Sequence, residues 1–277
     1  MLDISGKINK NKELTGKDQR LFRRIITGFM FLGEKHLVED VLNQIQITPD
    51  ARITKSAYNY LTLFPNESQI SQEILKYLKS PNNQFDYQEA WLLKILRYSL
   101  KNTLSIQKYA EEVFKNRDKH WYVKVQAINI MANRVIKPIN FNKCTKFYEK
   151  EKDPEVKRVL IKLLCQLDSE KQFEILLNAL YDPYYKISDL AKMLLMMRQT
   201  RELALTEINS LFRNFSERVL LDNFYKIGVL RFNTRKDVQK KLREKLLKVA
   251  PKIQSPYLKL KIKSVIKGIE YKQQKIA

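Results

Sequence analysis

The feature that most constrains the fold of this chain is a sequence phrase that occurs three times between residues 118 and 195. Each copy starts with an aspartate, continues to an apolar or aromatic residue followed by lysine, and leads into apolar residues spaced three and four apart. That spacing is the periodicity of a helix. The three lysines are Lys124, Lys157 and Lys186, at intervals of 33 and 29 residues. A recurring unit of this length is typical of an array of helix pairs.

Weaker copies of the phrase extend the pattern outward, to residues 53–61 and 85–93 on one side and to 216–220 and 255–259 on the other. The sequence therefore predicts an all-α chain with about seven helix pairs stacked as an α-solenoid. We expect a flexible basic N-terminus at 1–16 and a single solenoid over 17–277. Five apolar residues of the central copies are predicted to be buried between repeats: Ala127, Leu160, Leu164, Ala191 and Leu194.

Glycine is scarce, with six residues in the chain and none between Gly33 and Gly228. A β-rich fold or a phosphate-binding loop would need more of them. No Gly-rich phosphate loop, paired-histidine metal motif or nucleophile elbow occurs. The composition therefore favours helices and gives no catalytic motif, and Gly33 fits the end of a first helix that opens at Lys17.

The formal net charge of +22 indicates a polyanionic partner, and nucleic acid fits better than an anionic membrane. A compositional bias toward lysine without a selected role is the alternative. The excess is concentrated in residues 235–277, where 14 lysines and arginines face three acidic residues, a net charge of +11. We therefore predict a strongly basic C-terminal part at 235–277.

The lysines of the repeated phrase form the first candidate site. If each lies at the start of the second helix of a repeat, Lys124, Lys157 and Lys186 form a ladder that can follow a phosphate backbone. The residues expected to widen or extend this ladder are Arg158, Lys162, Lys192, Arg198, Lys94 and Arg97. The alternative is structural, with each lysine paired to a turn aspartate of its own or the next repeat.

Aromatic residues form a second candidate group. Trp91, Trp121 and His120 could stack on bases, but the tryptophans also fit the apolar period of a core, and His120 also fits a helix start. Cys144 and Cys165 are 21 residues apart and predict neither a disulfide nor a metal site, but buried thiols in a reducing cytoplasm. We expect no metal, no cofactor, no membrane span and no signal peptide.

The phrase Asp-x-x-Val-Lys with its apolar helix resembles HEAT repeats. The stretch from Asp86 to Leu93, followed by the copy from Tyr122 to Ile128, is similar to the helical C-terminal region of bacterial abortive-infection and defence-associated reverse transcriptases. That resemblance implies a role in antiviral defence, in which α-repeats wrap a polymerase and contact nucleic acid or sister subunits. The polymerase motif Tyr-x-Asp-Asp is missing, so no catalytic residue of that family is carried over.

Three functions remain open from the sequence. The first is a non-catalytic repeat module that binds DNA or RNA with little sequence preference, beside an enzyme partner such as a reverse transcriptase. The second is a scaffold for protein–protein contact or homo-oligomerisation. The third is a HEAT-like DNA glycosylase, for which Asp118 with Trp121, or Asp86 with Trp91 and Arg97, are the local candidates. Both aspartates are better explained as helix caps.

Overall fold

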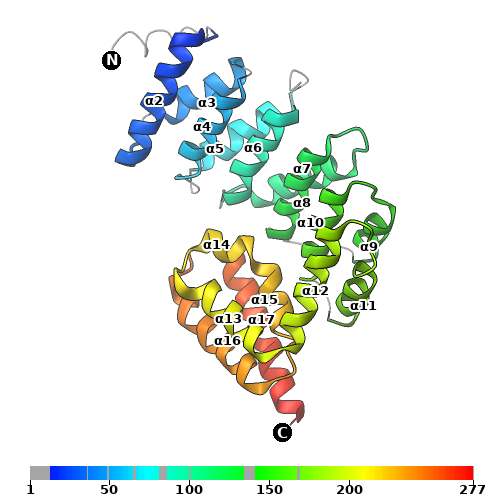
Figure 1. Ribbon diagram of the computed structural model, residues 1–277. Helices are drawn as coiled ribbons and strands as arrows, with labels where there is room; N and C mark the ends of the chain where they lie inside the picture. The colour runs from blue at the N-terminus through cyan, green and yellow to red at the C-terminus, as the bar shows by residue number, and fades with distance from the viewer. Residues whose placement is uncertain are drawn as a thin grey trace. The chain divides into compact units, whose positions relative to one another are not determined.

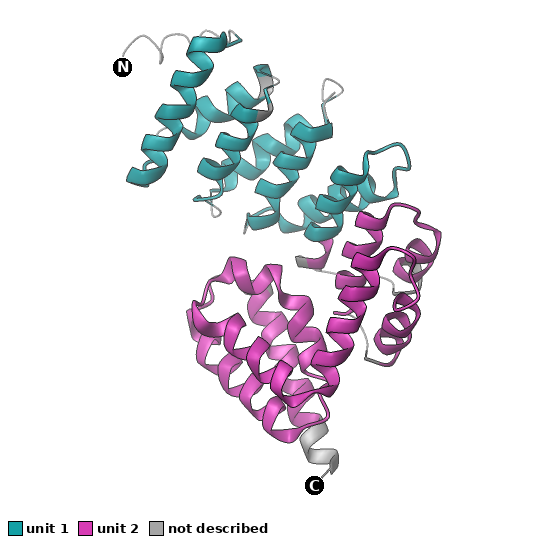
Figure 2. Ribbon diagram, in the orientation of Figure 1, with its two compact units in different colours: residues 1–130 teal, residues 131–277 magenta. Residues whose placement is uncertain are grey.

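The computed structural model describes residues 13–35, 37–48, 50–64, 67–80, 86–99, 101–133, 141–166 and 169–276. Within these ranges the chain forms sixteen α-helices and one short 3-10 turn, and it contains no strand (Figure 1). The predicted all-α class is confirmed. The contacts divide the chain into two compact units, residues 1–130 and 131–277 (Figure 2).

Unit 1 is built from helices that pack on their second neighbour in sequence as well as on the next one. Its helices are α2 (Gly16–Leu32), α3 (Val38–Ile47), α4 (Ala51–Leu61), α5 (Ser68–Leu78), α6 (Asp86–Tyr98), α7 (Thr103–Lys115) and most of α8 (Trp121–Asn133). Helix α4 packs against α2, α3 and α6, and α5 packs against α3 and α6. The side chains of Phe22, Ile53 and Leu93 are fully enclosed between these helices.

Unit 2 is organised around α12. Its helices are α9 (Phe141–Lys150), α10 (Pro154–Leu164), α11 (Ser169–Ala179), α12 (Tyr185–Gln199), α13 (Arg201–Arg213), α14 (Glu217–Asp222), α15 (Phe224–Leu230), α16 (Lys236–Val249) and α17 (Pro256–Ile276). Helix α12 packs against α10, α11, α13 and α15, while α16 packs against α13, α15 and α17. Leu160, Leu164 and Ala191 are fully buried in this unit, as the apolar period predicts.

Local signals explain several helix ends. Gly33 ends α2 with φ 68° and ψ 19°, a left-handed conformation that glycine adopts without a side-chain clash. Asp50 and Asp153 cap α4 and α10, because each side chain accepts hydrogen bonds from the backbone N–H groups of the second and third residues that follow it. The sequence predicted that Asp118 caps the next helix, but the side chain found at that helix start is His120. Helix α8 begins at Trp121, and the imidazole Nδ1 of His120 accepts from the backbone N–H of Tyr122.

Three boundaries differ from the sequence prediction. The single helix expected near 218–230 is interrupted at Asn223, whose φ of −108° and ψ of 12° separate α14 from α15. Helix α17 continues to Ile276, past the end expected near 269. Of the segment predicted to be flexible, residues 1–12 lie outside the described ranges, whereas Leu14 is buried and α2 already begins at Gly16. None of the helices in the described ranges combines the length and the apolar character needed to cross a bilayer.

Gly228 in α15 sits where no side chain fits. A Cβ atom added there would lie 2.7 Å from the backbone carbonyl oxygen of Cys165 and 3.4 Å from Cα of Gln166. Because backbone cannot move aside as a flexible side chain can, Gly228→Ala is expected to lower the free energy of unfolding by about 1–2 kcal/mol. Urea unfolding followed by circular dichroism measures this change.

The matched control is Gly268→Ala in α17, where an added Cβ would meet nothing within 4 Å. Since alanine is the better helix former, the control should gain about 0.5–1 kcal/mol. Equal effects of the two substitutions would show that α15 does not approach the end of α10 this closely.

Candidate nucleic-acid interface

Lys157 and Lys186, the two ladder lysines of unit 2, both lie beside carboxylates. The ammonium of Lys157 forms an ion pair with Asp182, whose side chain is only 6% exposed. Lys186 Nζ lies 3.9 Å from Glu155 Oε1, and the hydroxyl of Tyr184 donates to the same carboxylate. The pairing of Lys157 with the turn aspartate of the next copy is the structural arrangement that the sequence left as the alternative.

Glu155 links the same group of residues. Its carboxylate accepts from the guanidinium of Arg158, with Arg158 Nη2 at 2.8 Å. Partial burial opposes ionisation of Glu155, but Arg158, Tyr184 and Lys186 together outweigh it and hold the pKa of the carboxyl below its ordinary value. The positive charges of Arg158 and Lys186 are therefore partly neutralised where they stand.

The basic candidate residues of unit 1 also contact neighbouring groups of the protein. Lys94 Nζ lies 3.8 Å from the ring centroid of Trp91 and donates to the hydroxyl of Tyr122. Lys124 Nζ donates to the backbone carbonyl of Arg117 at 3.2 Å. The guanidinium of Arg97 lies against the ring of Tyr98.

The remaining candidates differ in exposure. Lys162 lies over the ring of Tyr225. Arg198 lies over Phe173, and burial lowers the pKa of its guanidinium. Lys192 alone among the nine predicted basic residues is both exposed and without a contact in the described structure. The predicted ladder thus places most of its cations against aromatic rings, carbonyls or carboxylates, and its role in binding stays a prediction.

The predicted stacking residues occupy three different environments. Trp91 is half-buried, packed on Tyr58 with the ring centroids 5.0 Å apart. Trp121 keeps 38% of its surface exposed, next to the exposed ring of His120. More exposed aromatic rings lie elsewhere: Tyr181, Tyr185 and Tyr271 keep 88%, 63% and 59% of their surface. The sequence did not single out these tyrosines, because solvent exposure leaves no mark on apolar periodicity.

The basic C-terminal part, residues 235–277, contains a group of exposed lysines that contact no other described side chain. Lys259, Lys263 and Lys267 follow one another at intervals of four residues on α17, and all three are exposed. Four residues advance a helix by about 6 Å and slightly more than one turn, so the three ammonium groups share one face. Within the described residues none of the three has a carboxylate, carbonyl or ring partner. Tyr271 extends the same face by one further step of four residues. We call these four residues the α17 face.

Two interactions fix the orientation of α17. Lys261 points to the opposite side of the helix, where its Nζ donates to the carbonyl of Ala132 at 2.6 Å and to Gln166 Oε1 at 2.8 Å. Burial of this ammonium lowers the pKa of Lys261 to about 7. Glu270 accepts from the guanidinium of Arg243 on α16 at 2.6 and 3.0 Å. Lys261 thus holds one side of α17 inward, and the three lysines on the other side face solvent. Glu270 lies three residues after Lys267 and seven after Lys263, so it shares their side of the helix, where its carboxylate is paired with Arg243.

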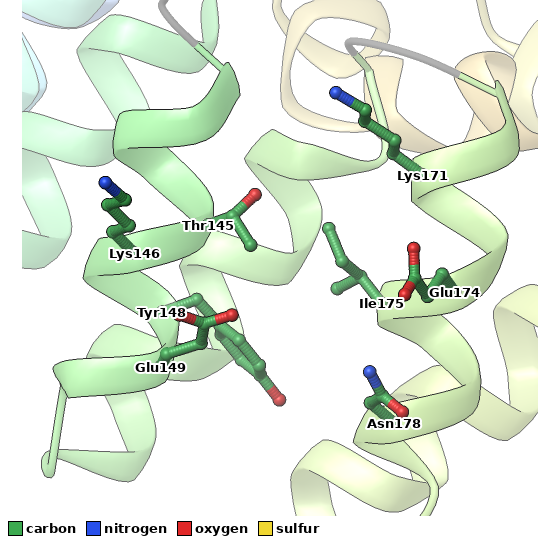
Figure 3. A pocket seen from close by; sticks show the side chains of 8 residues that line it. All are labelled: Thr145, Lys146, Tyr148, Glu149, Lys171, Glu174, Ile175 and Asn178. Atoms are coloured by element: carbon green, nitrogen blue, oxygen red, sulfur yellow. The ribbon is translucent and has the colours of Figure 1, made fainter.

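A hollow of about 390 Å³ lies between α9 and α11 (Figure 3). Its lining is mixed: Thr145, Lys146, Tyr148, Glu149, Lys171, Glu174, Ile175 and Asn178. Each of the two helices contributes one lysine and one glutamate, so the lining carries no net charge. Burial raises the pKa of the Tyr148 phenol to about 12, so the phenol stays protonated near neutrality.

The acids of the two glycosylase candidate sets lie at the surface. Asp86 and Asp118 are both exposed. Among the described residues no three His, Cys, Asp or Glu side chains come close enough together to hold a metal ion. No family model, no curated protein and no solved structure matches this chain.

Proposed function

We propose that this chain is a non-catalytic, HEAT-like α-solenoid module that binds nucleic acid through phosphate contacts and acts beside an enzyme partner. The observation that carries the proposal is the α17 face, whose three exposed lysines have no carboxylate partner among the described residues, in a chain with net charge +22. The packing of helices on their second neighbours supports the solenoid, because stacked helix pairs give that contact pattern.

The chemistry of the α17 face favours phosphate contact over base reading. A lysine ammonium is a compact point charge, whereas bidentate recognition of a base edge is best made by the planar fork of arginine. An exposed tyrosine beside the lysines supplies a stacking surface that accepts any base. Binding through these groups should therefore be strongly salt-dependent and tolerant of sequence.

A protein scaffold and a nucleic-acid module beside a polymerase make different demands on the α17 face. A protein scaffold needs no anion at the α17 face, and its lysines would serve solubility alone. The resemblance of residues 86–93 and 122–128 to defence-associated reverse transcriptase regions supports a polymerase as the enzyme partner. A nucleic-acid module and a polymerase partner are compatible, because α-repeats beside an active site can hold template or product.

The test of the proposal is a salt titration of binding. The affinity for a 20-base-pair duplex, measured by fluorescence anisotropy, should fall steeply with salt, with a log–log slope near −4 to −5 if about five phosphates are neutralised. Changing Lys259, Lys263 and Lys267 together to glutamine should flatten that slope by up to about 2.7, or about 0.9 for each phosphate that loses its lysine. Affinity at low salt should fall at least tenfold, for all sequences alike.

The matched control removes the same charge from exposed lysines of unit 1, by changing Lys76, Lys108 and Lys115 to glutamine. This control should leave the slope within about half a unit of the parent. Equal losses of affinity in the two triple variants would mean that net charge, and not the α17 face, drives binding. A parent chain that does not bind at low salt would leave the scaffold as the function.

A further inference from the structure

A second basic surface lies in unit 1, between α2 and α4, which pack side by side (Figure 1). A hollow of about 440 Å³ opens there, lined by Arg20, Arg23, Arg24, Thr27 and Ser56. Three arginines and two residues with hydroxyl groups therefore line the space, and no carboxylate of the described residues does. A hollow of several hundred cubic ångströms is the usual size of a small-molecule site.

Within the part of the chain that the structure describes, the side chains of the three arginines have no partner. Neither an ion pair nor a side-chain hydrogen bond engages Arg20, Arg23 or Arg24 in the described structure. Nε of Arg23 is enclosed and has no acceptor. An enclosed N–H donor without an acceptor is unfavourable, and an anionic oxygen bound in the hollow would supply one to the half-buried Arg23.

The hydroxyl groups narrow the chemistry of that ligand. Thr27 Oγ1 donates to the carbonyl of Arg23 at 2.8 Å, and Ser56 Oγ donates to the carbonyl of Arg52 at 3.0 Å. Their protons are thus committed to the helix backbones. The donors left for a ligand are guanidinium N–H groups, which pair with anionic oxygens in a forked geometry.

The kind of cation at this place is also informative. Of the 52 basic residues in the chain, 15 are arginines, and three of these fall within five consecutive positions of α2. A general enrichment of lysine does not produce such a cluster. Arginine suits phosphate better than lysine where several oxygens of one group are bound at fixed angles.

We infer that the hollow between α2 and α4 is a site for a terminal phosphate or diphosphate group, carried by a ligand of nucleotide size or by the phosphorylated end of a nucleic-acid strand. Arg23 holds the group from the enclosed side, and Arg20 and Arg24 close on it from the same helix. The site does not rest on the α17 face, since it belongs to other helices in the other unit, and it can exist in a chain that binds no duplex.

The experiment is calorimetric titration of the full chain at low salt with inorganic pyrophosphate as the probe. The parent chain should bind with a dissociation constant below about 1 mM, and the variant with Arg20, Arg23 and Arg24 all changed to glutamine should bind at least tenfold more weakly. The control with glutamine at Lys259, Lys263 and Lys267 should bind pyrophosphate like the parent. Arg24→Gln, at an exposed position that does not endanger folding, should alone weaken binding about threefold or more.

A second arm separates the two sources of phosphate. Short single strands of one sequence, with and without a 5′-phosphate, are compared in the parent and in the triple arginine variant. If the 5′-phosphate raises the affinity of the parent for the strand and this increase is lost in the variant, the ligand is a strand end. If pyrophosphate binds but the 5′-phosphate does not raise the affinity, the ligand is a small molecule. The proposal is overturned if the parent does not bind pyrophosphate. It is also overturned if the arginine triple variant and the lysine triple variant lose the same amount of affinity for pyrophosphate.

Discussion

Replacing Ala127 with aspartate is expected to lower the free energy of unfolding by about 4 kcal/mol, the largest stability effect that we predict. The methyl group of Ala127 is fully buried in α8, as are the neighbouring side chains of Val123 and Ile130. A carboxylate at this position would lose its hydration and find apolar groups around it. Equilibrium unfolding in urea, followed by far-ultraviolet circular dichroism, measures the difference from the parent.

Asn129→Asp is the matched control for this prediction. It places the same new charge on the same helix, at a half-buried position from which the side chain can reach water. The control should change the free energy of unfolding by less than about 1 kcal/mol. If Ala127→Asp were as stable as the control, α8 would not turn this face inward.

Helical periodicity indicates directly which side of a helix faces inward. It therefore predicted the burial of five residues: Ala127, Leu160, Leu164, Ala191 and Leu194. The end of α2 was predictable from Gly33, and the start of α10 from Asp153 followed by proline, because both depend on residues adjacent in sequence. The break at Asn223 was missed, since residues 217–230 keep an apolar period through it and asparagine is tolerated inside helices.

The candidate sites were less predictable, because interactions between helices decide which cations stay available. The sequence identified Lys157 as a candidate but could not show that Asp182, 25 residues later, folds against it. It identified 235–277 as basic but could not tell Lys261, which is held inside unit 2, from Lys259 and Lys263, which face solvent. The arginine hollow needs Ser56 of α4 beside α2, a neighbour that the spacing within α2 does not reveal.

The two possible roles of Lys157 are separated by Lys157→Met. Its side chain is 21% exposed, and its partner Asp182 keeps only 6% of its side chain exposed, with one further hydrogen bond from the backbone N–H of Tyr184. Removing the lysine leaves an enclosed carboxylate without its counter-charge, so the free energy of unfolding should fall by about 2–3 kcal/mol. The nucleic-acid affinity of the folded variant should stay within about twofold of the parent, because Lys157 is already committed to Asp182 and neutralises no phosphate.

Two further variants complete this test. Lys192→Met removes one charge from an exposed lysine of α12 and should leave stability within about 0.5 kcal/mol of the parent. In the double variant Lys157→Met with Asp182→Asn, the enclosed charge is gone, so the second change should recover at least about 1 kcal/mol of the stability. The opposite result, a stable Lys157→Met variant whose affinity falls tenfold and whose salt slope flattens by about one unit, would make Lys157 a phosphate ligand and restore the ladder as the binding site.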